Sequence, residues 1–137
     1  MVIKSPEKKY KSHNHRVYSC QYHVIFCPKY RRPVLIEEIS QRLKEILLET
    51  GEMYDFEIIE QEIMPDHVHL LISCDPEMGI SNCIKKMKSR SSHMLREEFP
   101  ELKSKLPCLW TRSYFVSTVG SVSLDIVKSY IQNQKKV

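Results

Sequence analysis

Two histidines that are one residue apart, His67 and His69, are the side chains whose type and spacing most directly suggest chemistry. On a β-strand, positions i and i+2 point to the same face, so both imidazoles would project side by side. Two imidazoles at this spacing can bind one divalent metal ion. The same pattern is also typical of two surface or half-buried histidines on an amphipathic strand, and the spacing alone leaves both interpretations open.

A second candidate pair, Tyr130 and Gln134, lies near the C-terminal end of the sequence. Residues four positions apart share one face of a helix. Leu124, Val127 and Ile131 would form the neighbouring apolar stripe of the same helix. Such a helix could bury one side and present the phenol and the carboxamide along its edge, which suits a nucleophile beside a metal ligand. The alternative is a partly buried tyrosine near a chain end.

Clusters of basic residues suggest a polyanionic partner. The net charge of +4 is weak support. The distribution says more, because basic residues concentrate before residue 33 and between 79 and 96, whereas 51–84 contains no lysine or arginine. These side chains could neutralise phosphates, although solvated surfaces are an equally good explanation. The residues that we assign to DNA binding are Lys29, Arg31, Arg32, Lys85, Lys86, Lys88, Arg90 and Arg112.

Length and composition exclude several classes of protein. The 137 residues fit one domain, and 42% hydrophobic residues suffice for a core. No apolar run approaches the roughly 20 residues that span a bilayer, and the basic N-terminal segment lacks the apolar core of a secretory signal. We therefore expect a cytoplasmic protein without membrane contact. Five cysteines without a Cys-x-x-Cys pair argue against a zinc ribbon or a disulfide framework. A phosphate-binding glycine loop is absent, which argues against a nucleotide cofactor.

Hydrophobic periodicity predicts an α+β fold. The expected elements are a strand over 17–27, a helix over 36–50, strands over 56–64 and 67–74, a helix over 80–98, a strand over 108–116 and a C-terminal helix over 121–137. The first six elements match the ferredoxin-like order strand-helix-strand-strand-helix-strand. They predict an antiparallel four-stranded sheet with two helices on one face. The third helix is an addition whose docking the sequence does not fix.

Several positions carry more local expectations. In the first strand, Tyr18, Cys20, Tyr22, Val24 and Phe26 would share one face, with Gln21 and His23 on the other. In the first helix, the buried stripe would consist of Ile36, Ile39, Leu43, Ile46 and Leu47. Gly51 would end that helix, and Ser121 or Ser123 would cap the last one. On the fourth strand, Trp110, Tyr114 and Phe115 could stack unpaired bases, although alternation requires some of them to lie in the core.

Four segments resemble one known family. Residues 64–72, MPDHVHLLI, resemble the HUH motif strand of the single-tyrosine transposases of bacterial and archaeal insertion sequences, which are related to the REP-associated tyrosine transposases. Residues 27–35, CPKYRRPVL, are similar to the segment after their first strand. Residues 109–115, LWTRSYF, resemble their fourth strand, and 124–134, LDIVKSYIQNQ, resemble their catalytic helix. The segments occur in order from about Tyr18 to Gln134, which is far more specific than the histidine pair alone.

The resemblance implies one HUH transposase domain over 1–137, with a basic N-terminal arm over 1–16 and the tyrosine on the helix over 121–137. It implies that Tyr130 attacks a backbone phosphate of single-stranded DNA at hairpin-flanked element ends and forms a 5′-phosphotyrosine. His67, His69 and Gln134 would bind Mg²⁺ or Mn²⁺, and Asp66 or Glu62 could replace Gln134 as a ligand. Members of this family act as homodimers, in which the C-terminal helix of one subunit can serve the histidine pair of the other.

Other functions remain open at this point. A domesticated relative would act on dispersed hairpin repeats rather than on its own element. A non-catalytic DNA-hairpin-binding protein would keep the fold without the reaction, but the set of His67, His69, Tyr130 and Gln134 argues against it. A replication initiator or relaxase is disfavoured because the chain is short and its tyrosine lies at the C-terminal end.

Overall fold

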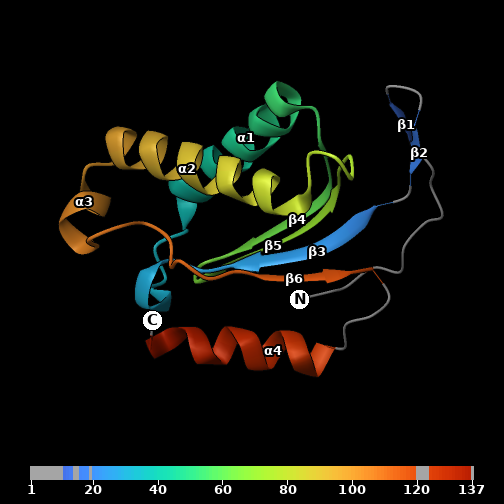
Figure 1. Cartoon of the computed structure of the whole chain (residues 1–137). Coiled ribbons are helices and arrows are strands. Elements are labelled where there is room, and N and C mark those ends of the chain that lie inside the picture. Colours follow the sequence, from blue (N-terminus) through green and yellow to red (C-terminus); the bar gives the residue numbers. More distant parts are fainter. Residues whose placement is uncertain (1–10, 14–15, 19, 120–123, 137) are drawn as a thin grey trace.

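The computed structural model describes residues 11–13, 16–18, 20–119 and 124–136 and has a four-stranded antiparallel sheet at its centre (Figure 1). The strands are β3 (Gln21–Phe26), β4 (Glu57–Met64), β5 (His67–Ser73) and β6 (Phe115–Thr118). The longer helices are α1 (Glu37–Tyr54), α2 (Ile80–Glu98) and α4 (Leu124–Asn133). The spatial strand order is β4-β5-β3-β6. This order and these pairings confirm the predicted ferredoxin-like arrangement.

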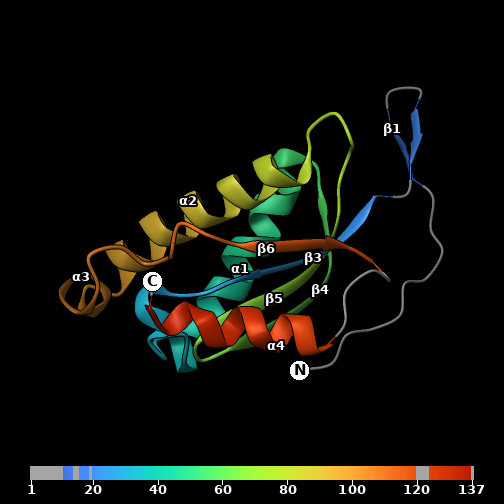
Figure 2. The same ribbon diagram turned by 60° about the horizontal axis from the view of Figure 1, so that its bottom comes forward.

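The two faces of the sheet have different covers. In Figures 1 and 2, α1 and α2 lie over one face and α4 lies along the other. Val24 and Phe26 of β3 and Val68, Leu70 and Ile72 of β5 belong to the large apolar core on the α1–α2 side. This alternation confirms the predicted face of the first strand over β3. It also confirms that His67 and His69 share the opposite face.

Helix α2 has the bounds that periodicity predicts, and its buried residues include Ile84, Met87 and Leu95. Helix α1 buries Ile39 and Leu43 as predicted. Ile36, however, is exposed and lies before the first turn of α1, so its place in the buried stripe was wrong. Among the helices of the described residues, none is long and apolar enough to cross a membrane.

Gly51 does not end the first helix. Helix α1 continues to Tyr54, and Asp55 follows it in the left-handed region with φ 59°. A Cβ atom at Gly51 would lie only 2.7 Å from the carbonyl oxygen of Phe56. Gly51 therefore serves the close approach of the chain that leaves α1, because any larger residue would meet this backbone atom.

The predicted fourth strand is much shorter than expected. Only β6 is a strand, and 108–114 is irregular apart from an isolated bridge between Pro28 and Trp110. The Trp110 ring packs edge-on against Phe26 at 4.7 Å, and its Nε1 donates to Ser91 Oγ at 2.9 Å. Trp110 is therefore a core residue and does not present a surface for a nucleic-acid base.

The predicted first strand is divided. Its beginning belongs to β2 (Arg16–Tyr18), which pairs with β1 (Lys11–His13) in a separate two-stranded hairpin. The rest of the expected arm, 1–10, and the expected helix caps Ser121 and Ser123 lie outside the described residues. A short helix that was not predicted, α3 (Glu101–Lys105), follows α2.

The contact at Gly51 generates a stability prediction. Gly51→Ala raises helix propensity by about 1 kcal/mol, but crowding in a packed site costs about 1–3 kcal/mol. We expect a net loss of about 1 kcal/mol in the free energy of unfolding, measured by urea denaturation. Glu52→Ala, at the next and exposed position of α1, is the control and should change stability by less than about 0.5 kcal/mol. A Gly51→Ala protein at least as stable as wild type would contradict this account.

Candidate active site

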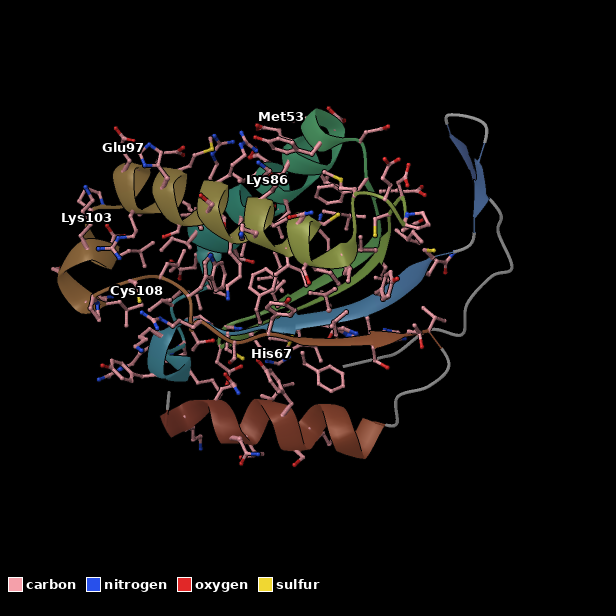
Figure 3. All side chains as sticks on the ribbon, in the orientation of Figure 1. Met53, His67, Lys86, Glu97, Lys103 and Cys108 are labelled. Atoms are coloured by element: carbon pink, nitrogen blue, oxygen red, sulfur yellow. The ribbon has the colours of Figure 1, made fainter. Side chains whose placement is uncertain are left out.

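Helix α4 covers the face of the sheet that carries the histidines. Ile131 of α4 packs against Ile25 of β3, and Phe115 of β6 and Tyr130 pack against this pair. The rings of Phe115 and Tyr130 are 5.5 Å apart. Figure 3 shows His67 on the side of the sheet that faces α4. The fold thus brings the predicted nucleophile and the predicted metal ligands to one face.

A serine that the sequence analysis did not single out joins Tyr130 to Gln134. Ser113 Oγ donates to Gln134 Oε1 at 3.0 Å, and Tyr130 Oη lies 3.2 Å from the same Oγ. Because the one hydroxyl proton of Ser113 is directed to Gln134, Tyr130 Oη–H is the donor in the other bond. Thr111 Oγ1 also donates to Gln134 Oε1, at 3.5 Å. Gln134 lies in the 3-10 turn η2 (Gln134–Lys136) and is 5% exposed.

Lys88 of α2 fixes the irregular segment that carries these hydroxyl groups. Its Nζ donates to the carbonyl oxygens of Thr111 at 2.5 Å and Ser113 at 3.1 Å. Burial lowers the pKa of Lys88 to about 8. The sequence assigned Lys88 to DNA binding, whereas its ammonium group here holds two backbone carbonyls of the site.

His67 is held through one ring nitrogen. Its Nδ1 lies 2.8 Å from Asp66 Oδ1 in the turn between β4 and β5. Its Nε2 is buried and has no hydrogen-bond partner among the described residues. A carboxylate acceptor at Nδ1 favours the tautomer in which Nε2 carries a lone pair. This orientation makes Nε2 of His67 a candidate metal-binding atom.

His69 is held by another histidine, His23 of β3. His69 Nε2 and His23 Nδ1 are 3.2 Å apart, and the rings are tilted by 33°. Both side chains are buried, and burial is the largest cause that lowers the pKa of each, to about 4 for His69. Both imidazoles are therefore neutral at pH 7, as metal ligation requires. Alternation placed His23 on this face, but no local sequence pattern predicts its contact with His69.

The donor set fits a divalent metal ion with two imidazoles and an amide. Within the described part of the chain, no three His, Cys, Asp or Glu residues group as a metal site. Asp66 uses one oxygen for His67 and the other for Arg31, whose Nε lies 3.0 Å from Oδ2. Glu62 of β4 lies opposite His69 in the sheet register. The buried lone Nε2 of His67 is the observation that favours a metal ion, because a buried polar atom needs a partner.

The other predicted DNA-binding residues either line a cavity beside α2 or hold two helices together. Lys85, Arg112 and Lys88 line one cavity beside α2, together with Trp110 and Tyr114. The guanidinium group of Arg90, in contrast, bonds Thr50 Oγ1 at 2.6 Å and the carbonyl oxygen of Ile46 at 3.4 Å, and so ties α2 to α1.

The remaining predicted DNA-binding residues are Lys86, Lys29 and Arg32, and the first two lie near aromatic rings. The Lys86 ammonium group lies 4.7 Å from the centre of the Tyr54 ring. Lys29 lies in η1 (Lys29–Arg31), 5.2 Å from the Tyr30 ring, and Arg32 is exposed. Both Lys29 and Arg32 are close in sequence to Arg31, which contacts the site.

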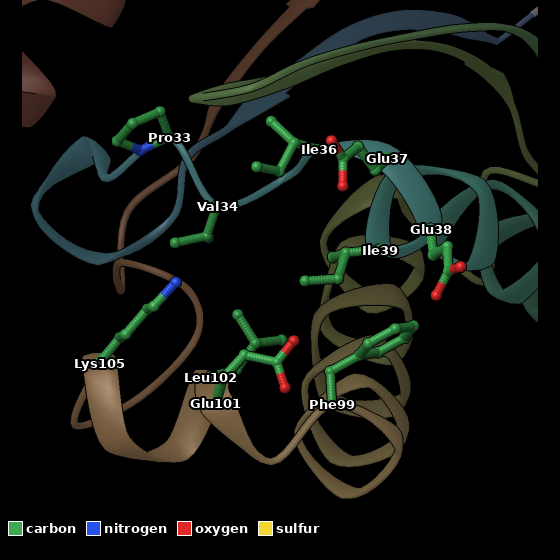
Figure 4. A pocket seen from close by; sticks show the side chains of 10 residues that line it. All are labelled: Pro33, Val34, Ile36, Glu37, Glu38, Ile39, Phe99, Glu101, Leu102 and Lys105. Atoms are coloured by element: carbon green, nitrogen blue, oxygen red, sulfur yellow. The ribbon is translucent and has the colours of Figure 1, made fainter.

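A separate pocket lies between the start of α1 and α3 (Figure 4). Val34, Ile39 and Leu102 form its apolar part, and Glu101 and Lys105 lie among its lining residues. None of the proposed catalytic, metal-binding or DNA-binding residues contributes to it. This pocket is therefore distinct from the site under α4.

Comparison with known proteins agrees with this geometry. The family model described as "Transposase IS200 like" matches residues 16–134. The ISDra2 transposase TnpA of Deinococcus radiodurans is 39% identical over 120 residues, which is 86% of each chain. A crystal structure of a protein from the same organism, described as a transposase, has a TM-score of 0.82 at 36% identity and covers 90% of this chain and 97% of the other.

A more distant structure shares the fold. The REP-associated tyrosine transposase bound to a REP hairpin has a TM-score of 0.57 at 13% identity, and the match covers 94% of this chain and 68% of that one. The family match and the sequence identity over most of both chains together decide the assignment: this chain belongs to the IS200-like transposases.

Proposed function

We propose that the protein cleaves and rejoins single-stranded DNA at hairpin-flanked element ends, with Tyr130 as nucleophile and a divalent metal ion at His67, His69 and Gln134. The observation that carries this proposal is the position of Tyr130 and Gln134, which share the Ser113 hydroxyl on the face of the sheet that holds the histidines. The family supports the reaction class, and the geometry supports the proposed roles of the residues.

The nucleophile needs activation. Burial raises the pKa of the Tyr130 phenol above its usual value near 10, whereas Ser113 lowers it, because the Ser113 hydroxyl can turn to donate to the phenolate that forms when the proton leaves. The bond to Ser113 also fixes the direction of the Tyr130 Oη atom. Attack of Oη on a backbone phosphorus would break the bond to the 3′ oxygen, leaving a 5′-phosphotyrosine and a 3′-hydroxyl. The ester bond is conserved in this exchange, so rejoining would need no nucleotide cofactor.

His67 through Nε2, His69 and Gln134 through Oε1 would hold Mg²⁺ or Mn²⁺. This N,N,O set leaves coordination positions open for a phosphate oxygen. The ion would offset the charge that builds on the phosphate and so favour attack by a phenol. Asp66 and His23 would keep the two imidazoles oriented, because each bonds one of the histidines.

The DNA would bind through the cationic positions around the site. Lys85 and Arg112 line the cavity beside α2, and Lys29 and Arg32 flank Arg31 near the C-terminal end of α4. A hairpin substrate is supported by the REP-associated relative, which is bound to a REP hairpin. The homodimer expected from the family is part of this proposal. In this single chain, α4 packs against the sheet of its own subunit.

A non-catalytic hairpin-binding protein is the alternative function. Such a protein would have no need for neutral, buried histidines or for a tyrosine joined to a glutamine. Burial of polar groups is unfavourable unless contacts compensate for it, so the buried set favours an enzyme. A domesticated enzyme would use the same residues and differ only in its target DNA.

The covalent intermediate is the direct test of the proposed reaction. Wild-type protein with labelled single-stranded DNA carrying the flanking hairpin ends should form a denaturant-resistant adduct with Mn²⁺ and none with EDTA. Tyr130→Phe should abolish the adduct, whereas Tyr54→Phe, on the far face of the molecule, should retain it. Tight hairpin binding by all proteins without any adduct would reject the enzyme and support the binding protein.

The Ser113 hydroxyl should affect both rate and pH dependence. One neutral hydrogen bond contributes about 1 kcal/mol, so we expect Ser113→Ala to slow adduct formation by about fivefold. Because this bond lowers the pKa of Tyr130, its loss should move the rise of the rate with pH to higher pH. Ser104→Ala in α3 is the matched control. A slower variant with an unchanged pH profile would show that Ser113 does not act on the phenol.

Neutral His69 generates a prediction about acid stability. Its pKa is lowered from 6.5 to about 4 in the folded protein. Between these two pH values the unfolded chain is therefore protonated at His69, whereas the folded chain is not. Stability should therefore be full above about pH 6.5 and fall as the pH drops toward 4, measured by urea denaturation with EDTA. His69→Gln should weaken this dependence, and His93→Gln, an exposed histidine, should leave it unchanged. Equal pH dependence in wild type and His69→Gln would contradict the assignment.

A further inference from the structure

Arg31 has an unusual backbone. Tyr30 and Arg31, two successive residues that are not glycine, have φ values of 59° and 51°. The left-handed region is unfavourable for such residues, and it persists where surrounding contacts fix it. The amide of Arg31 donates to the carbonyl oxygen of Pro28 at 2.8 Å, which closes this turn. The turn directs the side chain of Arg31 inward, where it is 13% exposed.

The Arg31 guanidinium group joins two elements that are far apart in sequence. Its Nη1 donates to the carbonyl oxygen of Ile131 in α4 at 3.1 Å. Its Nε lies 3.0 Å from Asp66 Oδ2, in the turn before β5, as an ion pair and not as an aligned hydrogen bond. The turns η1 and η2 are also in contact, so Arg31 lies where the chain leaves α4. Because its guanidinium group already has two protein partners, Arg31 differs from an exposed surface arginine that would bind a phosphate.

The contact with Ile131 is a cap on the tyrosine helix. Helix α4 ends at Asn133, so the carbonyl of Ile131 is among the last four, which lack partners within an α-helix. A cation at this end also interacts favourably with the helix dipole. The last turn of α4 contains no basic residue of its own. Arg31 therefore supplies from η1 the charge that α4 lacks.

The contact with Asp66 leads to the histidine pair. The carboxylate of Asp66 accepts from His67 Nδ1 through Oδ1 while Oδ2 faces Arg31. The positive guanidinium group holds this carboxylate in place beside His67. One continuous path of polar contacts thus runs from the helix that carries Tyr130, through Arg31 and Asp66, to His67.

We propose that Arg31 is a positioning residue that couples the docking of α4 to the orientation of His67. The proposal rests on the proposed function, in which Tyr130 at one end of this path is the nucleophile and His67 at the other end is a metal ligand. Arg31 holds the C-terminal end of α4 beside the sheet and, through Asp66, holds the His67 ring with Nε2 toward the site. Lysine at this position would keep the charge but could not bond both partners with a planar fork.

The first experiment measures hydrogen–deuterium exchange of the α4 amides without metal or DNA. We expect about tenfold faster exchange in Arg31→Met and a smaller increase in Arg31→Lys, because a charge-assisted hydrogen bond is lost or weakened. Asp66→Asn should also speed exchange in α4, although the contacts of Asp66 among the described side chains are with His67 and Arg31 and not with this helix. The double variant should exchange no faster than Arg31→Met alone. Arg32→Met, at the exposed neighbouring position, is the matched control.

The second experiment titrates Mn²⁺ into the same proteins and follows the free ion by electron paramagnetic resonance. Loss of a residue that orients a ligating histidine typically weakens metal binding about 10–100-fold, and we expect the low end of this range for Arg31→Met. Unchanged α4 exchange in Asp66→Asn would overturn the coupling. Faster exchange in Arg31→Met with unchanged Mn²⁺ affinity would also overturn it and leave Arg31 as a helix cap alone. Absence of Mn²⁺ binding by wild type would contradict the proposed function, while the exchange experiment would still decide the coupling.

Discussion

The central sheet is covered on both faces, and the rest of the structure depends on this constraint. All seven residues of β5 are buried, so the histidines on one face are largely shielded from water, as are the aliphatic residues on the other. Buried polar groups are unfavourable without hydrogen-bond partners. Asp66 and His23 supply partners for His67 and His69, and one nitrogen, Nε2 of His67, is left for a ligand. Burial therefore lowers the pKa of His69, and the contacts that burial requires orient both candidate metal ligands.

The same constraint gives α4 two tasks. The helix must shield the histidine face from water, which it does through Ile131 against Ile25, and it must present Tyr130 to that face. Among the described side chains of α4, Tyr130 and Ile131 pack against the sheet, and hydrogen bonds with Ser113 and Arg31 also help to place the helix. These polar contacts are directional, unlike apolar burial. The hydrogen bond with Ser113 therefore directs the Tyr130 Oη atom, while packing against Phe115 places its ring.

Local sequence patterns predicted those features that local physics decides. The spacing of apolar side chains predicted helix α2 and the alternation of β5, and the family motifs indicated Tyr130, Gln134 and both histidines as candidate site residues. Period could not predict the irregular segment 108–114, because its conformation depends on Lys88 from α2 and on the bridge between Pro28 and Trp110. Ser113 lies in that segment and therefore had no recognisable role in the sequence. The docking of α4 and the contact of His23 with His69 were hidden for the same reason, since both join residues distant in the chain.

The basic residues show why charge type alone does not assign a role. Lysine and arginine are suited to phosphates, but they are equally suited to carbonyl oxygens that secondary structure leaves without partners. How deeply a basic side chain is buried decides whether it binds backbone carbonyl oxygens or remains available for a phosphate. Lys88 and Arg90 are half-buried, and both donate to backbone carbonyl oxygens of neighbouring elements, whereas Lys85 and Arg112 are exposed. A guanidinium group that is bonded on two sides has fewer donors left for a phosphate than an exposed one. The exposed positions are therefore the ones whose substitution should weaken DNA binding, while the half-buried positions maintain the geometry against which the DNA would be held.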